Sequence, residues 1–147
     1  MTAPLPAIQA SVDACKVLDF PGHSDDRGSL TFMESPKDLP FDVRRIYYLY
    51  DVPAGKARGA HAHRALEQVF IAIAGSFTLL LDDGVQQREV HFDSPRRGLY
   101  VPPMLWRDLR DFSPGAVCVV LASAGYLESD YIRDHAAFLE AARAGQR

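Results

Sequence analysis

Two histidines that lie two positions apart are the residues of this sequence best suited to proton transfer. They stand in the alternating stretch RGAHAH, residues 58–63. Side chains two apart on a strand leave the same face, so His61 and His63 are expected to point the same way. Histidine has an unperturbed pKa of about 6.5 and can accept or release a proton near neutral pH. With Glu67 close behind them, the histidines predict a proton-transfer site or part of a metal site.

A metal site of the usual kind needs at least three well-placed ligands with further groups behind them. The other histidines fall in a predicted turn (His23), on a different predicted strand (His91) and in the C-terminal tail (His135). Two histidines and one carboxylate are therefore the most that the sequence offers to a metal ion. We interpret the pair as a proton-transfer site and keep a metal site as the alternative.

The elements that position this pair are predicted to be short strands. Turn signals separate them, and the clearest is Asp82-Asp83-Gly84, which is typical of a hairpin. Many short strands at regular spacing indicate an antiparallel sandwich or barrel. Only the tail, residues 130–144, has a helical pattern. The predicted strands are 12–18, 29–34, 41–52, 58–63, 67–74, 76–81, 85–92, 99–101, 106–112 and 116–122.

Composition bounds the class of protein. A chain of 147 residues fits one domain, residues 1–147, and the Pro- and Ala-rich residues 1–10 are predicted to be poorly ordered. With 48% hydrophobic and 24% charged residues and no apolar run long enough to span a bilayer, a soluble globular protein is expected. The N-terminus lacks the features of a secretory signal, so we expect a cytoplasmic protein.

Charge and cysteine content exclude two further kinds of site. A net charge of -3 gives no basic surface for nucleic acid, so any phosphate in the ligand must meet a few local arginines. The two cysteines, Cys15 and Cys118, are flanked by apolar residues and are expected to be reduced core positions. A disulfide or a cysteine-based metal site is not expected.

The spacing Gly-x5-His-x-His-x3-Glu, formed by Gly55, His61, His63 and Glu67, resembles the first motif of the cupins. This resemblance implies an all-β fold, the cupin jelly roll or double-stranded β-helix, here with a short C-terminal helix. In metal cupins a later hairpin supplies another histidine. The corresponding region, residues 98–107, has none, and Arg107 stands where many relatives carry histidine.

A series of short motifs extends the resemblance to residues 17–138. In order, they are DRGSL (26–30), LPF (39–41), RIYY (45–48), RGAHAH (58–63), DDG (82–84), GLYV (98–101), DFS (111–113) and DYIR (130–133). Together they resemble the nucleotide-sugar 3,4-ketoisomerases, which convert dTDP-4-keto-6-deoxyglucose into a 3-keto isomer on the way to 3-amino-3,6-dideoxy sugars. The resemblance implies a cupin with no metal or other cofactor, and a homodimer with exchanged N-terminal strands.

The chemistry of such a reaction suits the residues. Moving a ketone from C4 to C3 needs a base for the acidic proton on C3 and an acid that protonates C4 of the enediol, and His61 and His63 can serve both carbons. Tyr48, on the neighbouring predicted strand, is expected to donate a hydrogen bond to the enediolate or to relay the proton. Tyr47 is the alternative, because the faces of that strand are assumed.

Other residues are predicted to bind the substrate. Arginine forks onto phosphate oxygens, so Arg58 and Arg27 are candidates for the diphosphate, with a surface ion pair as the alternative for each. Glu67 and Trp106 complete the predicted binding residues. The DYIR motif at 130–133 is expected to dock the C-terminal helix through its Tyr and Arg.

Three functions remain open at this stage: the isomerase, a metal-dependent cupin oxygenase, and a non-catalytic nucleotide-sugar-binding cupin. A 3,5-epimerase of the same substrate is a close relative in chemistry. A purely structural role for the histidines is disfavoured, because the small residues Gly59, Ala60 and Ala62 open space around them. The stereochemistry at C4 of the product, the choice of dTDP or UDP, and the division of acid and base between the histidines are left undecided.

Overall fold

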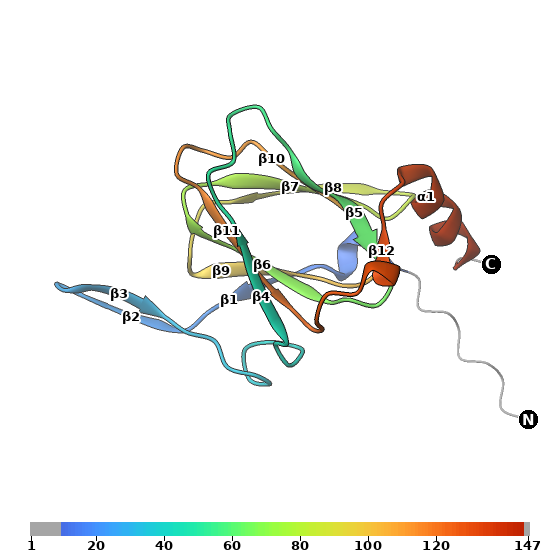
Figure 1. Ribbon diagram of the computed structural model, residues 1–147. Helices are drawn as coiled ribbons and strands as arrows, with labels where there is room; N and C mark the ends of the chain where they lie inside the picture. Colours follow the sequence, from blue (N-terminus) through green and yellow to red (C-terminus); the bar gives the residue numbers. More distant parts are fainter. Residues whose placement is uncertain (1–9, 146–147) are drawn as a thin grey trace, which may run out of the picture.

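The computed structural model describes residues 10–145, and most of the segment 1–10 that was predicted to be poorly ordered lies outside them. Two five-stranded sheets, antiparallel throughout, face each other (Figure 1). The first has the order β1 (Lys16–Asp19), β9 (Arg97–Val101), β6 (Gln68–Ala74), β11 (Val117–Ala122) and β4 (Arg45–Leu49). The second has the order β12 (Tyr131–Ile132), β5 (Arg58–His63), β10 (Trp106–Arg110), β7 (Phe77–Asp82) and β8 (Gln87–Phe92).

The main core lies between these sheets. Phe70 of the first sheet and Phe77 and Leu79 of the second are at most 1% exposed and belong to one apolar cluster. The strand pattern places such residues inward, because alternate side chains of a half-buried strand face the core. The all-β jelly roll with a short C-terminal helix is thereby confirmed.

One end of this sandwich is closed by the short 3-10 turn η1 (Val12–Ala14). The Val12 N–H donates to Asp83 Oδ2 at 2.9 Å, and Arg88 Nη1 donates to the carbonyls of Val12 and Cys15 at 3.3 and 3.2 Å. Val12 is 2% exposed and belongs to the main core. The cavity lies toward the other edge of the two sheets, beside β4 and β12.

A two-stranded hairpin, β2 (Gly22–Asp25) and β3 (Gly28–Thr31), projects away from the sandwich (Figure 1). At the other end of the chain, the turn η2 (Glu128–Asp130) leads into β12, and the helix α1 (His135–Ala144) follows. The side chain of Asp134 caps α1 by accepting from the Ala137 N–H at 3.0 Å. None of the helices within residues 10–145 is long and apolar enough to cross a bilayer.

Several predicted boundaries are wrong at their ends. The predicted strand 41–52 forms only β4, the predicted strand 12–18 is a 3-10 turn followed by β1, and the helix begins at His135 because Asp134 caps it there. The hairpin at Asp82-Asp83-Gly84 is confirmed between β7 and β8. Cys15 and Cys118 are buried and free, as predicted.

Candidate active site

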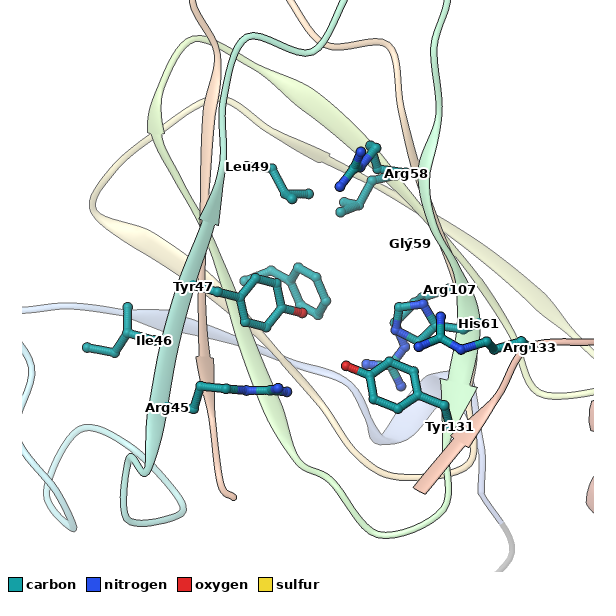
Figure 2. A pocket seen from close by; sticks show the side chains of 12 residues that line it. Arg45, Ile46, Tyr47, Leu49, Arg58, Gly59, His61, Arg107, Tyr131 and Arg133 are labelled. Atoms are coloured by element: carbon teal, nitrogen blue, oxygen red, sulfur yellow. The ribbon is translucent and has the colours of Figure 1, made fainter. Parts of the chain in front are cut away.

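A cavity of about 420 Å³ opens between the edge strand β4 of the first sheet and β5, β10 and β12 of the second (Figure 2). Its walls combine cationic, aromatic and imidazole side chains. It is lined by Arg45, Ile46, Tyr47, Leu49, Arg58, Gly59, His61, Phe70, Arg107, Leu109, Tyr131 and Arg133.

The two predicted histidines lie at this cavity and contact each other. Their Nε2 atoms are 3.1 Å apart, and their rings are nearly perpendicular, at 88°. The prediction that they share a strand face is confirmed. His61 lines the cavity, whereas His63 is fully buried behind it. A ligand in the cavity therefore meets His61 first and His63 only through His61.

Asp130 fixes the protonation pattern of this pair. Its Oδ2 lies 2.9 Å from His63 Nδ1, and a carboxylate can only accept, so His63 Nδ1 carries a proton. When both rings are neutral, His63 Nε2 is consequently an acceptor and His61 Nε2 the donor between them. The remaining nitrogen of His61, Nδ1, then holds a free lone pair. In this arrangement His61 Nδ1 can accept a proton, and His61 is connected through His63 to a carboxylate.

The segment that carries Asp130 is built into the site by backbone pairing. Asp130 Oδ1 accepts from the Ala65 N–H at 2.7 Å, and its carbonyl accepts from the Arg64 N–H at 2.9 Å. The next residue, Tyr131, pairs in register with His63 on β5. Its ring lies 5.0 Å from the His61 ring and 4.4 Å from the His63 ring, and thus covers the pair.

The surroundings favour the neutral forms of both histidines. Burial, with repulsion from Arg107 and His63, lowers the pKa of His61 to about 3. Burial and Arg107 also lower the pKa of His63, against the opposing effect of its hydrogen bond to Asp130. Desolvation disfavours a charged imidazole, and a nearby cation adds to that effect.

Arg107 is a cation next to this histidine pair, because it lies directly opposite His61 where β10 pairs with β5. It is 1% exposed, and among the described residues no carboxylate pairs with it. Burial lowers the pKa of its guanidinium to about 10, so it keeps its charge at neutral pH. Its Nη1 donates to Gln68 Oε1, and Gln68 Nε2 donates to the Tyr47 hydroxyl at 2.8 Å.

Three further arginines, Arg45, Arg58 and Arg133, line the cavity, and no carboxylate of residues 10–145 does. Arg133 is held by Glu128 through two hydrogen bonds of 2.8 and 2.9 Å and lies over the Tyr131 ring. The Nε atom of Arg45 is buried and has no hydrogen-bond partner within the described residues. A cavity with this charge is suited to an anionic ligand.

Tyr47, rather than Tyr48, faces the cavity. Tyr47 lies on the inward face of β4 and its hydroxyl points across the cavity toward His61 (Figure 2), whereas Tyr48 is 59% exposed on the outer face. The assumed orientation of this strand is therefore wrong and the alternative tyrosine holds the position. The error arose because both faces of β4 carry tyrosine.

The predicted binding residues divide between the cavity and other places. Arg58 lines the cavity, whereas Arg27 lies in the turn between β2 and β3, where it pairs with Asp25 at 2.7 Å. Glu67 accepts from the Tyr100 hydroxyl at 2.6 Å and lies outside the cavity. Trp106 packs against His135 and Phe138 of α1. Within one chain, only Arg58 of this predicted set lines the cavity.

Sequence reasoning missed several residues of the site. Tyr131 and Arg133 were expected to dock the C-terminal helix and instead line the cavity, and Asp130 holds the histidine pair. The signal was the DYIR motif itself, which places a carboxylate, a phenol and a guanidinium within four residues. For Gln68, the first residue of a buried strand, no signal was present.

No group of three or more His, Cys, Asp or Glu side chains within residues 10–145 is arranged to hold a metal ion. Within the described residues, the carboxylate that contacts the histidine pair is that of Asp130, at His63 Nδ1. Glu67 instead accepts from the Tyr100 hydroxyl. His61 Nε2, both ring nitrogens of His63 and Asp130 Oδ2, which could bind a metal, are thus engaged in contacts with one another.

The chain is similar to known proteins over most of its length. The FdtA family model, described as WxcM-like, C-terminal, matches residues 13–143. A TDP-4-oxo-6-deoxy-alpha-D-glucose-3,4-oxoisomerase from Aneurinibacillus thermoaerophilus is 46% identical over 120 residues, which cover 82% of this chain and 86% of the relative.

Solved structures give the same result. A 3,4-ketoisomerase from Helicobacter canadensis superposes with a TM-score of 0.86 at 43% identity, over 88% of this chain and 98% of the other. A histidine-to-asparagine mutant of the 3,4-ketoisomerase QdtA from Thermoanaerobacterium thermosaccharolyticum, in complex with TDP-4-keto-6-deoxyglucose, superposes with a TM-score of 0.89 at 34% identity, over 91% and 97%. The chain therefore belongs to the FdtA family and to the nucleotide-sugar 3,4-ketoisomerases.

Proposed function

We propose that this protein moves the keto group of dTDP-4-dehydro-6-deoxyglucose from C4 to C3, in the biosynthesis of 3-amino-3,6-dideoxy sugars. The observation that carries the proposal is a base, His61, that lines a cavity rich in arginine and is backed by His63 and Asp130. The relative from Aneurinibacillus thermoaerophilus is named for TDP-linked 4-keto-6-deoxyglucose, and the QdtA mutant is in complex with that sugar, which supports the choice of substrate.

The reaction transfers hydrogen from C3 to C4 and a hydroxyl proton from O3 to O4. His61 takes the C3 proton on its free Nδ1, and the charge that develops on the ring is shared through the Nε2–Nε2 contact with His63 and stabilised by Asp130. The imidazolium exchanges its proton with solvent and can then protonate C4. In this scheme His61 is the single base and acts on one face of the sugar, while His63 contacts His61 from the buried side.

The enediolate that forms between these steps carries negative charge on the sugar oxygens. The Tyr47 hydroxyl accepts a hydrogen bond from Gln68, so its own proton is available to these oxygens. Donors that are already in place where charge develops stabilise the transition state strongly. Burial raises the pKa of Tyr47, which keeps the phenol protonated.

The diphosphate of the substrate is proposed to bind the arginines at the cavity wall. Arg45, Arg58 and Arg133 are available there, and Arg133 exchanges its contact with Glu128 for a phosphate oxygen. The prediction for Arg58 from sequence is thereby kept as a proposal.

Proton NMR in D2O tests the function. Protein treated with chelator and incubated with dTDP-4-keto-6-deoxyglucose is expected to yield a 3-keto product with deuterium at C4. The same reaction in H2O leaves a proton at C4, and the coupling of that proton to H5 reports the C4 stereochemistry. Binding without exchange would support a non-catalytic cupin instead. Activity that appears only after metal is added would support the metal-dependent alternative, and exchange at C3 and C5 with the ketone still at C4 would support an epimerase. Parallel reactions with the UDP-linked sugar compare the two nucleotides.

The pH profile of the wild-type protein is the first prediction. A general base acts in its neutral form, so activity is present above the pKa of the free enzyme's base and is lost as pH falls through it. Because the pKa of His61 is lowered to about 3, kcat/KM is expected to stay constant from about pH 7.5 down to about pH 5.5. An acid limb near the ordinary value of about 6.5 would contradict the prediction, provided that circular dichroism shows a folded protein.

A homodimer with exchanged N-terminal strands is proposed as the working assembly, with the cytoplasm as its location. The hairpin β2–β3 makes its strand pairs only within itself and projects from the sandwich, and an isolated hairpin is marginal in water. Large apolar side chains are exposed on this hairpin and on the first sheet: Val17, Leu30, Ile46, Tyr48 and Ile73. A partner that covers them could also receive Arg27 near its cavity.

Light scattering after size exclusion is expected to give twice the 16.3 kDa chain mass at micromolar concentration. Leu30→Asp on the hairpin is expected to shift the protein toward the monomer, because it places a charge in the proposed contact. Val85→Asp, at another exposed apolar residue, in the β7–β8 turn, serves as the control. A wild-type monomer would contradict this assembly without affecting the ketoisomerase proposal.

A further inference from the structure

The hydrogen bonds of Arg107 run in one direction only. A guanidinium donates and never accepts, so the side chain of Gln68 must turn its carbonyl oxygen toward Arg107. The second nitrogen of Arg107, Nη2, donates to the Leu105 carbonyl at 3.0 Å, which holds the guanidinium in place. Gln68 is fully buried, and Arg107 is 1% exposed. The orientation of the Gln68 amide is thus imposed by a buried cation.

The orientation of the Gln68 amide determines how Tyr47 forms its hydrogen bonds. With its oxygen on Arg107, the Gln68 amide presents Nε2 to the Tyr47 hydroxyl oxygen at 2.8 Å, and an amide nitrogen can only donate. The Tyr47 proton cannot point back along this bond. Tyr47 lines the cavity, so its O–H is directed toward whatever lies there (Figure 2).

Three strands hold this chain of hydrogen bonds. Arg107 comes from β10 of the second sheet, Gln68 from the start of β6, and Tyr47 from the edge strand β4. The pairing of β6 and β4 with β11 fixes where the last two stand. The network therefore crosses from one sheet to the other at the base of the cavity, and the backbone sets its geometry before any ligand binds.

We propose that Gln68, oriented by Arg107, is a positioning residue that makes Tyr47 a hydrogen-bond donor to the sugar oxygen that becomes negative in the reaction. The inference rests on the proposed 3,4-ketoisomerase function. A tyrosine that donated to its protein neighbour would present lone pairs to the enediolate and would repel it. Gln68 thus controls the sign of the interaction between Tyr47 and the transition state.

Gln68→Glu tests this directly, because it keeps the shape of the side chain and reverses one hydrogen bond. One carboxylate oxygen still accepts from Arg107. The other faces the Tyr47 hydroxyl and accepts a hydrogen bond from it, so the O–H no longer points into the cavity. The kcat for dTDP-4-keto-6-deoxyglucose is expected to fall by roughly 100-fold, the usual effect of losing one such donor, with KM changed by less than about 3-fold. Tyr47→Phe is expected to show a similar loss.

The double variant separates positioning from a general effect of the new charge. Once the phenol is absent, Gln68→Glu has no proton to redirect, so it should lower the kcat of Tyr47→Phe by less than about 3-fold. Gln87→Glu, the same change at an exposed residue of β8, is the matched control and should leave kcat unaltered. Should Gln68→Glu fail to fold, Gln68→Met removes the amide and is expected to lower kcat by about 10-fold in the Tyr47 background alone.

The outcomes separate this inference from the function on which it rests. An inactive wild-type protein would remove the ketoisomerase proposal itself. An active wild type together with a Gln68→Glu variant of nearly normal kcat, or with an equal loss in the Tyr47→Phe background, would overturn the role of Gln68 and leave the ketoisomerase intact. Full activity of Tyr47→Phe would do the same.

Discussion

His61→Asn is expected to lower kcat by about 1,000-fold, because among the described residues His61 supplies the one imidazole that lines the cavity. Asparagine retains a similar length and a hydrogen-bonding group near His63, so the fold and the binding of dTDP should persist. It offers no basic nitrogen for the C3 proton. The measurement is the rate of deuterium incorporation at C4 followed by NMR in D2O.

His63→Asn is expected to cost less, about 100-fold, since His63 acts through His61 and has no access to the cavity. The double variant should be no slower than His61→Asn alone, because residues that act as a unit are not additive. His91→Asn, on the exposed side of β8, is the matched control and should remain active. A His63→Asn variant that is slower than His61→Asn would reverse the assignment of the base.

Local pattern was sufficient where the chemistry is local. His61 and His63 are two apart on a strand, and the period of that strand places them together whatever surrounds it. The same period did not reveal which face of β4 is inside. Its outer face carries exposed Ile46 and Tyr48, which are as apolar as a core-facing set. A sequence pattern cannot separate an internal core from a surface that awaits a partner.

Contacts between distant segments were beyond the sequence for a different reason. Asp130 lies 67 positions from His63, and nothing in the spacing of either residue indicates the other. Arg107 was noted only as the residue that stands where many relatives carry histidine, and it was given no role, yet it lies buried inside the sandwich, where charged side chains are seldom found. Three of the buried polar side chains, His63, Gln68 and Arg107, lie together at the candidate site, where the proposed role of the cation and of the neutral histidine pair is in chemistry rather than stability.

Asp130→Asn is the second large effect, and it acts through the direction of protons. Two donors converge on the Asp130 carboxylate, the Ala65 N–H at 2.7 Å and His63 Nδ1 at 2.9 Å. An asparagine has one acceptor for these two. If the amide oxygen stays with Ala65, its NH2 group faces His63 and forces Nδ1 to become the acceptor.

The change then propagates along the pair of rings. His63 must carry its proton on Nε2, so His61 Nε2 becomes the acceptor and His61 Nδ1 takes the proton. The base is thus blocked, and kcat is expected to fall by about 100-fold or more. Asp130→Ala leaves His63 free to choose its tautomer and should be less severe. Asp134→Asn, whose side chain can still cap α1, is the matched control.

Comparing the kcat of Asp130→Asn with that of Asp130→Ala shows what the carboxylate does. If it supplied only negative charge to a protonated His63, asparagine and alanine would lower kcat equally, because both are neutral. If it sets the tautomer, asparagine is the worse of the two. Equal rates, measured by the same deuterium incorporation at C4 with melting temperatures in parallel, would leave Asp130 as an electrostatic partner and would remove the argument that His61 Nδ1 is the base.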